Sequence, residues 1–239
     1  MNDTKASTAP ARILAVVTSA GEYESVGYRT GLWLGELTHF HDVVTEDGHQ
    51  VDIVSIKGGD VPLDPESLSA PVLLMGGTKK RYQDRAFMDL LRGTKSVADV
   101  DVEDYDAIYL TGGHGTMFDF TDARLAELVG AFAAQGKIVS SVCHGAVGLL
   151  EVTVDGQPLV KGREVTGFSW NEEKVAGRQE AVPFNLQERL KELGADYTKA
   201  LAPMVEKVVV DEKLVTGQNP TSAKGVAKAV LELLDRAPN

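Results

Sequence analysis

The chain is poor in cysteine, in positive charge and in long apolar runs. Its 239 residues include one cysteine, Cys143, which excludes an intrachain disulfide and a cysteine-cluster metal site and indicates a reducing compartment. The 24 Lys and Arg residues are outnumbered by 35 Asp and Glu, and the net charge of -11 argues against binding to a nucleic-acid backbone. No apolar run reaches the roughly 18 to 20 residues of a membrane-spanning helix, and residues 1–10 lack the apolar stretch of a signal peptide. We therefore expect a cytoplasmic protein that binds neither nucleic acid nor membranes.

Strand-like and helix-like segments alternate along the chain, which is typical of parallel βαβ units. Short β-branched runs predict buried strands at 12–19, 51–56, 106–111 and 138–142. Apolar stripes and terminal glycines predict helices at 30–48, 79–92, 121–135, 183–193 and 220–235. Residues 154–157 and 210–213 are expected to be tight turns between short strands. The pattern favours an α/β fold with a mostly parallel central sheet.

No segment of the chain has the composition of a linker, and no internal repeat is present. We expect a disordered tail over residues 1–10 and a single domain over residues 11–239. Residues 57–78 are rich in Gly, Pro and Asp and are expected to form a loop.

Two predicted strands end in chemically unusual sequences, TGGHG at 111–115 and SVCHG at 141–145. In open parallel sheets, ligands bind beyond the carboxyl ends of the strands, so we expect both segments to face one crevice. The second segment has the layout of a nucleophile elbow, with Ser141 and Gly145 allowing a sharp turn around Cys143. Cysteine would take the place that serine usually has as the nucleophile.

Cys143 precedes an apolar stretch suited to a helix start. Backbone N–H groups and the dipole at a helix N-terminus favour a thiolate, so we expect a lowered thiol pKa and a reactive cysteine. The competing interpretation is a small buried apolar residue, which lone cysteines commonly are. The adjacent His144 and the small flanking residues favour the functional interpretation.

The glycines at 112 and 113 have two interpretations. A dinucleotide-binding GxGxxG motif starting at Gly113 would need glycine at 118, where Phe118 stands, so this motif is excluded. A turn free of Cβ atoms beside a nucleophile suits an oxyanion hole, with Gly112 and Gly113 and the N–H of His144 as candidates. The alternative is a turn that needs glycine only for steric reasons.

Glu36 is an unexpected residue for its position. It lies one turn after Leu32 and Trp33 and one turn before Phe40, within or beside the apolar stripe of its predicted helix. Burial there, or a nearby thiolate, would raise its pKa and let it donate and accept protons. The alternative is a carboxylate at the edge of the stripe that reaches water.

A third candidate feature is the pair His39 and His41, which has the appearance of a metal-ligand pair. Side chains two residues apart on a helix point away from each other, so solvated or core histidines are expected instead.

Five segments together resemble the PfpI-like superfamily of class I glutamine-amidotransferase-type folds, which includes the parkinsonism-associated deglycase. These segments are TGLWLGE at 30–36, YDAIYLTGGHGTMFD at 105–119, VCHG at 142–145, VTGFSWNEE at 165–173 and LVTGQNPTSA at 214–223. Within the superfamily, the chain is most similar to the heat-inducible chaperone branch known as glutathione-independent glyoxalase III.

The resemblance implies a set of site residues. It places the nucleophile at Cys143, its histidine at His144, and the acid that completes the triad at Glu173, with the neighbouring Glu172 as the competitor. Ser169 and Glu172 have the spacing of a capping box, which would give Glu172 a structural role. The family's acid on the first helix, which bonds to the cysteine, corresponds to Glu36.

The resemblance also implies a flavodoxin-like three-layer sandwich, a homodimer, no cofactor and no metal. His114, Trp170 and Glu172 are further candidates for the lining of the substrate pocket. Residues 57–100 match the family only loosely, and we expect them to form a cap or insertion at the site. Amidotransferase activity does not follow, because the chain contains no synthetase domain.

The resemblance favours a glyoxalase that converts methylglyoxal, or a related 2-oxoaldehyde, to a 2-hydroxy acid through a Cys143 hemithioacetal. Two alternatives use the same thiol. One is a deglycase or cysteine amidase or peptidase that acts on glycated proteins or small amides. The other is a redox-sensing stress chaperone that binds misfolded proteins.

Overall fold

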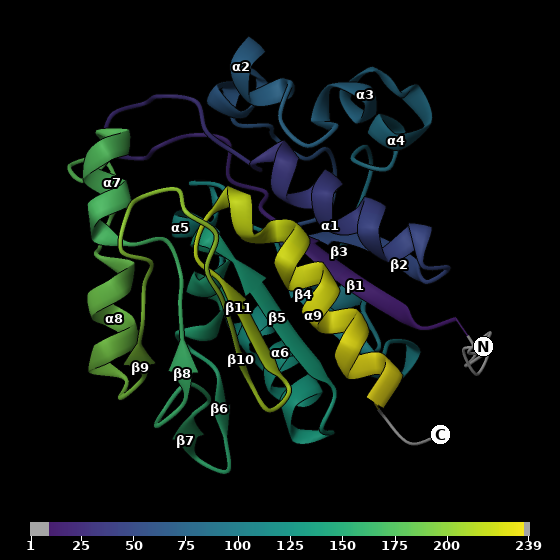
Figure 1. The fold of residues 1–239 in the computed structure, drawn as a ribbon, viewed down its shortest axis with the longest axis vertical. Helices are drawn as coiled ribbons and strands as arrows, with labels where there is room; N and C mark the ends of the chain where they lie inside the picture. Colours follow the sequence, from purple (N-terminus) through teal and green to yellow (C-terminus); the bar gives the residue numbers. More distant parts are fainter. Residues whose placement is uncertain (1–9, 237–239) are drawn as a thin grey trace, which may run out of the picture.

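A seven-stranded sheet forms the centre of the computed structural model, which describes residues 10–236 (Figure 1). The strand order is β10-β11-β5-β4-β1-β2-β3, and neighbouring strands are parallel except for β10 and β11. The strands are β1 (Arg12–Val17), β2 (Gln50–Ser55), β3 (Lys95–Ser96), β4 (Ala107–Leu110), β5 (Ile138–Val142), β10 (Val208–Asp211) and β11 (Leu214–Gly217). The α/β fold with a mostly parallel sheet is confirmed.

Helices cover both faces of this sheet and make the molecule three layers thick. Helix α1 (Leu34–Glu46) packs beside α9 (Ala223–Arg236) on one face, where Phe40 and Val226 are buried with the sheet residues Ala15 and Tyr109. The other face carries α6 (Ala123–Ala134), α5 (Thr116–Asp119) and the 3-10 helix η4 (Cys143–Leu149). The sandwich that the family resemblance implied is therefore present.

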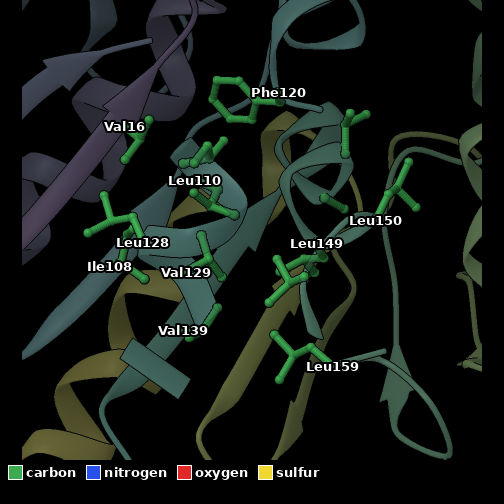
Figure 2. Close-up of a cluster of buried hydrophobic side chains, with 14 of the residues drawn as sticks. Val16, Ile108, Leu110, Phe120, Leu128, Val129, Val139, Leu149, Leu150 and Leu159 are labelled. Atoms are coloured by element: carbon green, nitrogen blue, oxygen red, sulfur yellow. The ribbon is translucent and has the colours of Figure 1, made fainter. Parts of the chain in front are cut away.

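The core beneath α6 is built from aliphatic side chains of three neighbouring strands. Figure 2 shows Val16, Ile108 and Val139 facing Leu128 and Val129 of α6. Most of these side chains are completely buried, as expected for parallel strands covered by helices on both faces. This core fixes the strand ends that carry the two Gly-rich segments.

The remaining elements are short. They are η1 (Pro65–Leu68), α2 (Ala70–Leu73), α3 (Thr78–Gln83), α4 (Arg85–Asp89), η2 (Val97–Asp99), η3 (Val102–Asp104), β6 (Thr153–Val154), β7 (Gln157–Pro158), β8 (Glu164–Val165), α7 (Trp170–Ala176), α8 (Leu186–Glu192), β9 (Asp196–Tyr197) and η5 (Pro220–Ser222). Strands β6 and β7 form an antiparallel hairpin, and β8 pairs in parallel with β9. The turns predicted at 154–157 and 210–213 do join antiparallel strands.

The helix predicted over 30–48 is wrong at its start, because residues 30–33 are not helical. Leu32 pairs with the chain at Leu63, and its N–H donates to the Pro62 carbonyl oxygen at 2.8 Å. The helix therefore begins at Leu34 and keeps Glu36 in its first turn.

The single helix predicted over 79–92 is also wrong. Two short helices, α3 and α4, meet at Asp84, which has an extended backbone. The Asp84 carboxylate accepts hydrogen bonds from the N–H groups of Ala86 and Phe87, so this residue caps the second helix instead of continuing the first.

The segment 57–100 lies mainly beside α1, with α2, α3 and α4 gathered at the top of Figure 1. His39 of α1 and Thr78 of α3 are in hydrogen-bond contact at 3.0 Å. Residues 1–9 of the expected N-terminal tail lie outside the described residues. Within residues 10–236, none of the helices combines the length and the apolar character needed to cross a membrane.

Gly145 provides a test of the close contact between η4 and β4. A Cβ at this position would overlap the Leu110 carbonyl oxygen, and backbone cannot move aside as a side chain can. We expect Gly145→Ala to lower the free energy of unfolding by about 3 kcal/mol, measured by urea denaturation. Gly130→Ala on α6 is the matched control, because its Cβ would make only ordinary contacts. Equal stability of the two variants would contradict the prediction.

Candidate active site

Cys143 occupies the junction between β5 and η4 with an unusual backbone. Its φ is 57°, a left-handed value that non-glycine residues seldom adopt and that often marks a functional position. The residue is 3% exposed, and its carbonyl oxygen accepts a hydrogen bond from the Phe168 N–H. Space for the turn comes from Gly112, where a Cβ would overlap the Glu36 carboxyl and crowd Cys143.

A chain of buried polar contacts runs from this thiol. The Cys143 Sγ lies 3.4 Å from Nδ1 of His144, and Nε2 of His144 lies 2.8 Å from Oε2 of Glu173 in α7. The predicted capping box is present, and it directs Glu172 to Ser169 instead. Glu173, not Glu172, therefore contacts His144.

His114 is a second histidine on the same carboxylate. Its Nε2 lies 2.9 Å from Oε1 of Glu173, and its ring centroid lies 4.2 Å from that of His144. The sequence placed His114 at the pocket but did not indicate this contact. The one sequence feature that pointed toward it is that TGGHG at 111–115 follows β4, and β4 lies next to β5 in the sheet.

The charge states of Glu173 and His144 follow from their burial and from the two histidines beside Glu173. Burial alone would raise the pKa of Glu173, but His144 and His114 lower it to well below its usual range. Burial, reinforced by the nearby His114, lowers the pKa of His144. At neutral pH, a neutral His144 donates its Nε2 proton to an ionised Glu173, which leaves Nδ1 free to accept the thiol proton.

Glu36, unlike Glu173, is kept in its neutral, protonated form. It is 0% exposed, and neither carboxyl oxygen has a hydrogen-bond partner of good geometry among the described residues. Burial raises its pKa to about 8, although contacts with the Cys143 thiol and the Gly112 N–H oppose the shift. Of the two interpretations of Glu36, the structure supports the buried carboxyl. Near pH 7 this carboxyl is mostly protonated.

The expectation of a lowered thiol pKa at Cys143 is wrong. Burial and the adjacent Glu36 raise the pKa of Cys143, and the N–H of His144 opposes this only in part. The helix that follows is a short 3-10 segment, so its N-terminus provides little compensation for the lost hydration. The thiol therefore needs a base to lose its proton, and His144 Nδ1 is in contact with it.

The Gly112–Gly113 turn and the Cys143–His144 turn are tied together by Thr116. Its hydroxyl contacts the carbonyl oxygens of Gly113 at 2.9 Å and His144 at 3.0 Å. Gly113 has a φ of 114°, and a Cβ there would overlap Gly31 and Trp33. Gly113 and His144 both line one cavity, and the role of their N–H groups as an oxyanion hole stays a prediction.

This cavity has a volume of about 230 Å³ and lies over the thiol. Its lining consists of Trp33, Glu66, Gly113, His114, Cys143, His144, Phe168, Val175, Ala176, Met204 and Pro220. Glu66 of η1 is the only one of these lining residues that comes from the segment 57–100. Trp170 and Glu172 were expected in the lining, and both expectations are wrong. Trp170 packs against the apolar core, and Glu172 points into a buried hydrogen-bond network.

A metal-binding geometry exists at one place among the described residues. His114, His144 and Glu173 each offer a ligand atom within 4.8 Å of the others. Glu173 already contacts Nε2 of both histidines, so a metal would have to replace those hydrogen bonds. His39 and His41 do not form a pair, because His39 contacts Thr78 and His41 lies by Asp42.

Fold and site together define a class: α/β proteins with a cysteine, a histidine and a glutamate joined at the carboxyl edge of a parallel sheet. A sequence profile of the DJ-1/PfpI family matches residues 31–233, and the chain belongs to the DJ-1/PfpI family. The resemblance noted from the motifs is thereby confirmed.

Three relatives place the chain within the family. It is 30% identical to a glutathione-independent glyoxalase of Saccharomyces cerevisiae, over 95% of this chain and 99% of the relative. The crystal structure of glyoxalase III from Candida albicans matches with a TM-score of 0.86 and 29% identity, covering 93% and 97% of the two chains. The Francisella tularensis Rapid Encystment Protein 24 kDa matches with a TM-score of 0.88 and 38% identity, covering 94% and 99%.

The contact between Glu36 and Cys143 can be tested by titrating the thiol. The chain has one cysteine, so the pH dependence of alkylation by iodoacetamide, followed by mass spectrometry, reports this thiol alone. Because Glu36 raises the pKa of Cys143, we expect Glu36→Gln to move the titration midpoint to lower pH. Glu46→Gln, an exposed carboxylate on the same helix, is the control and should titrate like the wild type. An unchanged midpoint in Glu36→Gln would show that burial alone sets the thiol pKa.

The raised pKa of Glu36 also predicts a pH dependence of stability. Below about pH 4.5 the carboxyl is protonated in both the folded and the unfolded chain. As pH rises to about 8, only the unfolded chain releases this proton freely, so the folded state loses stability until its own carboxyl ionises. Relative to Glu36→Gln, the wild type should lose about 5 kcal/mol across this window, and the difference should level off above it. Parallel stability curves from denaturation at a series of pH values would contradict the buried, protonated carboxyl.

Proposed function

We propose that the chain is a glutathione-independent glyoxalase that converts methylglyoxal or a related 2-oxoaldehyde to a 2-hydroxy acid such as lactate. The observation that carries this proposal is that the Cys143 thiol, which lines one small cavity, contacts both a neutral His144 and a protonated Glu36. A nucleophile, a base and an acid are then within reach of two adjacent carbon atoms. The names of the similar yeast proteins support the same activity.

The first step is addition of the thiol to the aldehyde carbon, C1. His144 Nδ1 takes the thiol proton as the sulfur–carbon bond forms, and returns it to the aldehyde oxygen to give a hemithioacetal. Ionised Glu173 stabilises the imidazolium that exists between these two transfers. Gly113 and His144 N–H groups stabilise the charge on the oxygen.

The second step moves a hydrogen from C1 to the neighbouring C2. His144 removes the C1 proton while Glu36 protonates the C2 oxygen, which gives an enediol that is still bound to sulfur. His144 then protonates C2, and the C1 hydroxyl returns its proton to Glu36. C1 is oxidised to a thioester and C2 is reduced to an alcohol, with no external electron carrier required.

The third step is hydrolysis of the thioester. His144 takes a proton from water as the water oxygen attacks C1, and the same proton goes to the departing Cys143 sulfur. The product is the 2-hydroxy acid, and the enzyme returns to its starting state. The net reaction adds one water to the 2-oxoaldehyde.

Further proposals concern partners and location. We propose a homodimer, which the family resemblance supports, and a cytoplasmic location, which the single cysteine and the acidic composition support. Burial of the thiol to 3% exposure beneath a cavity of about 230 Å³ favours a small aldehyde over glycated or misfolded proteins.

The test is formation of lactate from methylglyoxal without glutathione, with Cys143 kept reduced. We expect Cys143→Ser to abolish turnover, and Glu36→Gln to lower kcat by about 100-fold because an acid–base group is lost. Glu46→Gln on the same helix serves as the control. Absence of lactate from the wild type would overturn the glyoxalase proposal, and a wild-type rate in Glu36→Gln would refute the proton-transfer role.

A further inference from the structure

We infer that Met204 determines the specificity of this site, and that the preferred 2-oxoaldehydes carry an apolar substituent larger than methyl on the keto carbon. The inference rests on the proposed glyoxalase activity. It comes from the outer wall of the cavity and from the way the chain holds Met204 there.

Met204 lies at the cavity in a conformation that costs free energy. Its φ is 59°, in the left-handed region that an unbranched non-glycine residue adopts only when its surroundings impose it. Its N–H donates to Oε1 of Glu172 at 2.9 Å, and its carbonyl oxygen accepts from the Thr221 hydroxyl at 3.1 Å. The backbone on both sides of the side chain is therefore held in place.

Glu172 is a buried carboxylate that the proposed reaction does not use. It is 0% exposed and accepts hydrogen bonds from the amides of Gln218 and Asn219, both at 2.8 Å, and from the backbone and hydroxyl of Ser169. A buried charge with this many donors forms a rigid network. Met204 is attached to that network, so its position does not depend on the substrate.

The lining of the cavity has a polar and an apolar part. The polar part consists of Cys143, His144 and His114. The apolar part, here called the wall, consists of Trp33, Phe168, Val175, Ala176, Met204 and Pro220. Glu66 also lines the cavity, and it forms an ion pair with Arg178. With C1 of the aldehyde on the sulfur, the substituent on C2 shares the cavity with these apolar side chains.

The size of the cavity exceeds that of methylglyoxal. The cavity of about 230 Å³ is several times the roughly 30 Å³ that one water molecule takes in the liquid, so it has room for more than a few small atoms. Methylglyoxal supplies three carbons and two oxygens and leaves part of the wall uncovered. A branched alkyl or phenyl group would cover it. Each additional buried methylene typically strengthens binding about fourfold.

The experiment compares kcat/KM for glyoxal, methylglyoxal and phenylglyoxal, whose substituents are hydrogen, methyl and phenyl. For the wild type we expect values that rise in this order, by about fourfold for the methyl group and by at least about tenfold more for the phenyl group, of which only part is buried against the wall. Met204→Asn removes the apolar side chain but keeps a residue that tolerates the left-handed backbone. It should lower the ratio of phenylglyoxal to glyoxal about tenfold. Comparing ratios between proteins removes the differences in intrinsic reactivity among the aldehydes.

Leu201→Asn is the matched control, because Leu201 lies three residues earlier, is fully exposed and does not line the cavity. It should keep the wild-type ratio, and thermal unfolding of all three proteins should confirm equal folding. Turnover with an identical ratio in the wild type and Met204→Asn, or a wild-type preference for glyoxal or methylglyoxal over phenylglyoxal, would overturn this inference and leave the proposed function standing. No turnover of any of the three aldehydes would overturn both.

Discussion

The site depends on keeping one carboxylate charged in a place with almost no water. Glu173 is nearly buried, and an isolated carboxylate there would take up a proton. Two histidines from different strand ends prevent this by contacting both of its oxygens. The ionised Glu173 fixes the orientation and the proton of His144, and so directs Nδ1 to the thiol. The Gly-rich turns, the position of α7 and the Thr116 contact all serve to bring these groups together.

Glu36 shows how the same residue type acquires the opposite protonation state on the other side of the thiol–histidine pair. It has no histidine or other cation beside it and no well-made hydrogen bond within the described part of the chain, so burial keeps it protonated. One carboxyl is thus ready to orient a base and the other to donate a proton. The thiol lies between them and has no charge of its own until His144 accepts its proton. In the proposed reaction, this division allows proton transfer without an exposed ionised cysteine.

The sequence predicted those features that depend on neighbouring residues. The run 138–142 became a strand with the expected bounds, and the Ser169–Glu172 capping box formed, because both are determined locally. The helix expected over 30–48 failed at its start because Leu32 pairs with a distant segment near Leu63. The His114–Glu173 contact was missed for a similar reason, since it depends on where α7 lies against the end of β4. The thiol pKa was misjudged because burial, which the sequence does not quantify, outweighs the helix N-terminus.

Three of the groups that work against folding belong to the candidate site or its cavity wall. Cys143 and Met204 have left-handed backbones, and Glu36 lacks good hydrogen bonds, so each makes folding less favourable. The opposing stabilisation comes from the two apolar cores on either side of the sheet, which contain most of the fully buried side chains. Because these cores hold the strand ends rigidly, these residues cannot relax into ordinary conformations. The Cys143 backbone and the Glu36 carboxyl are therefore set before any substrate arrives, and the proposed reaction moves protons without rearranging the chain.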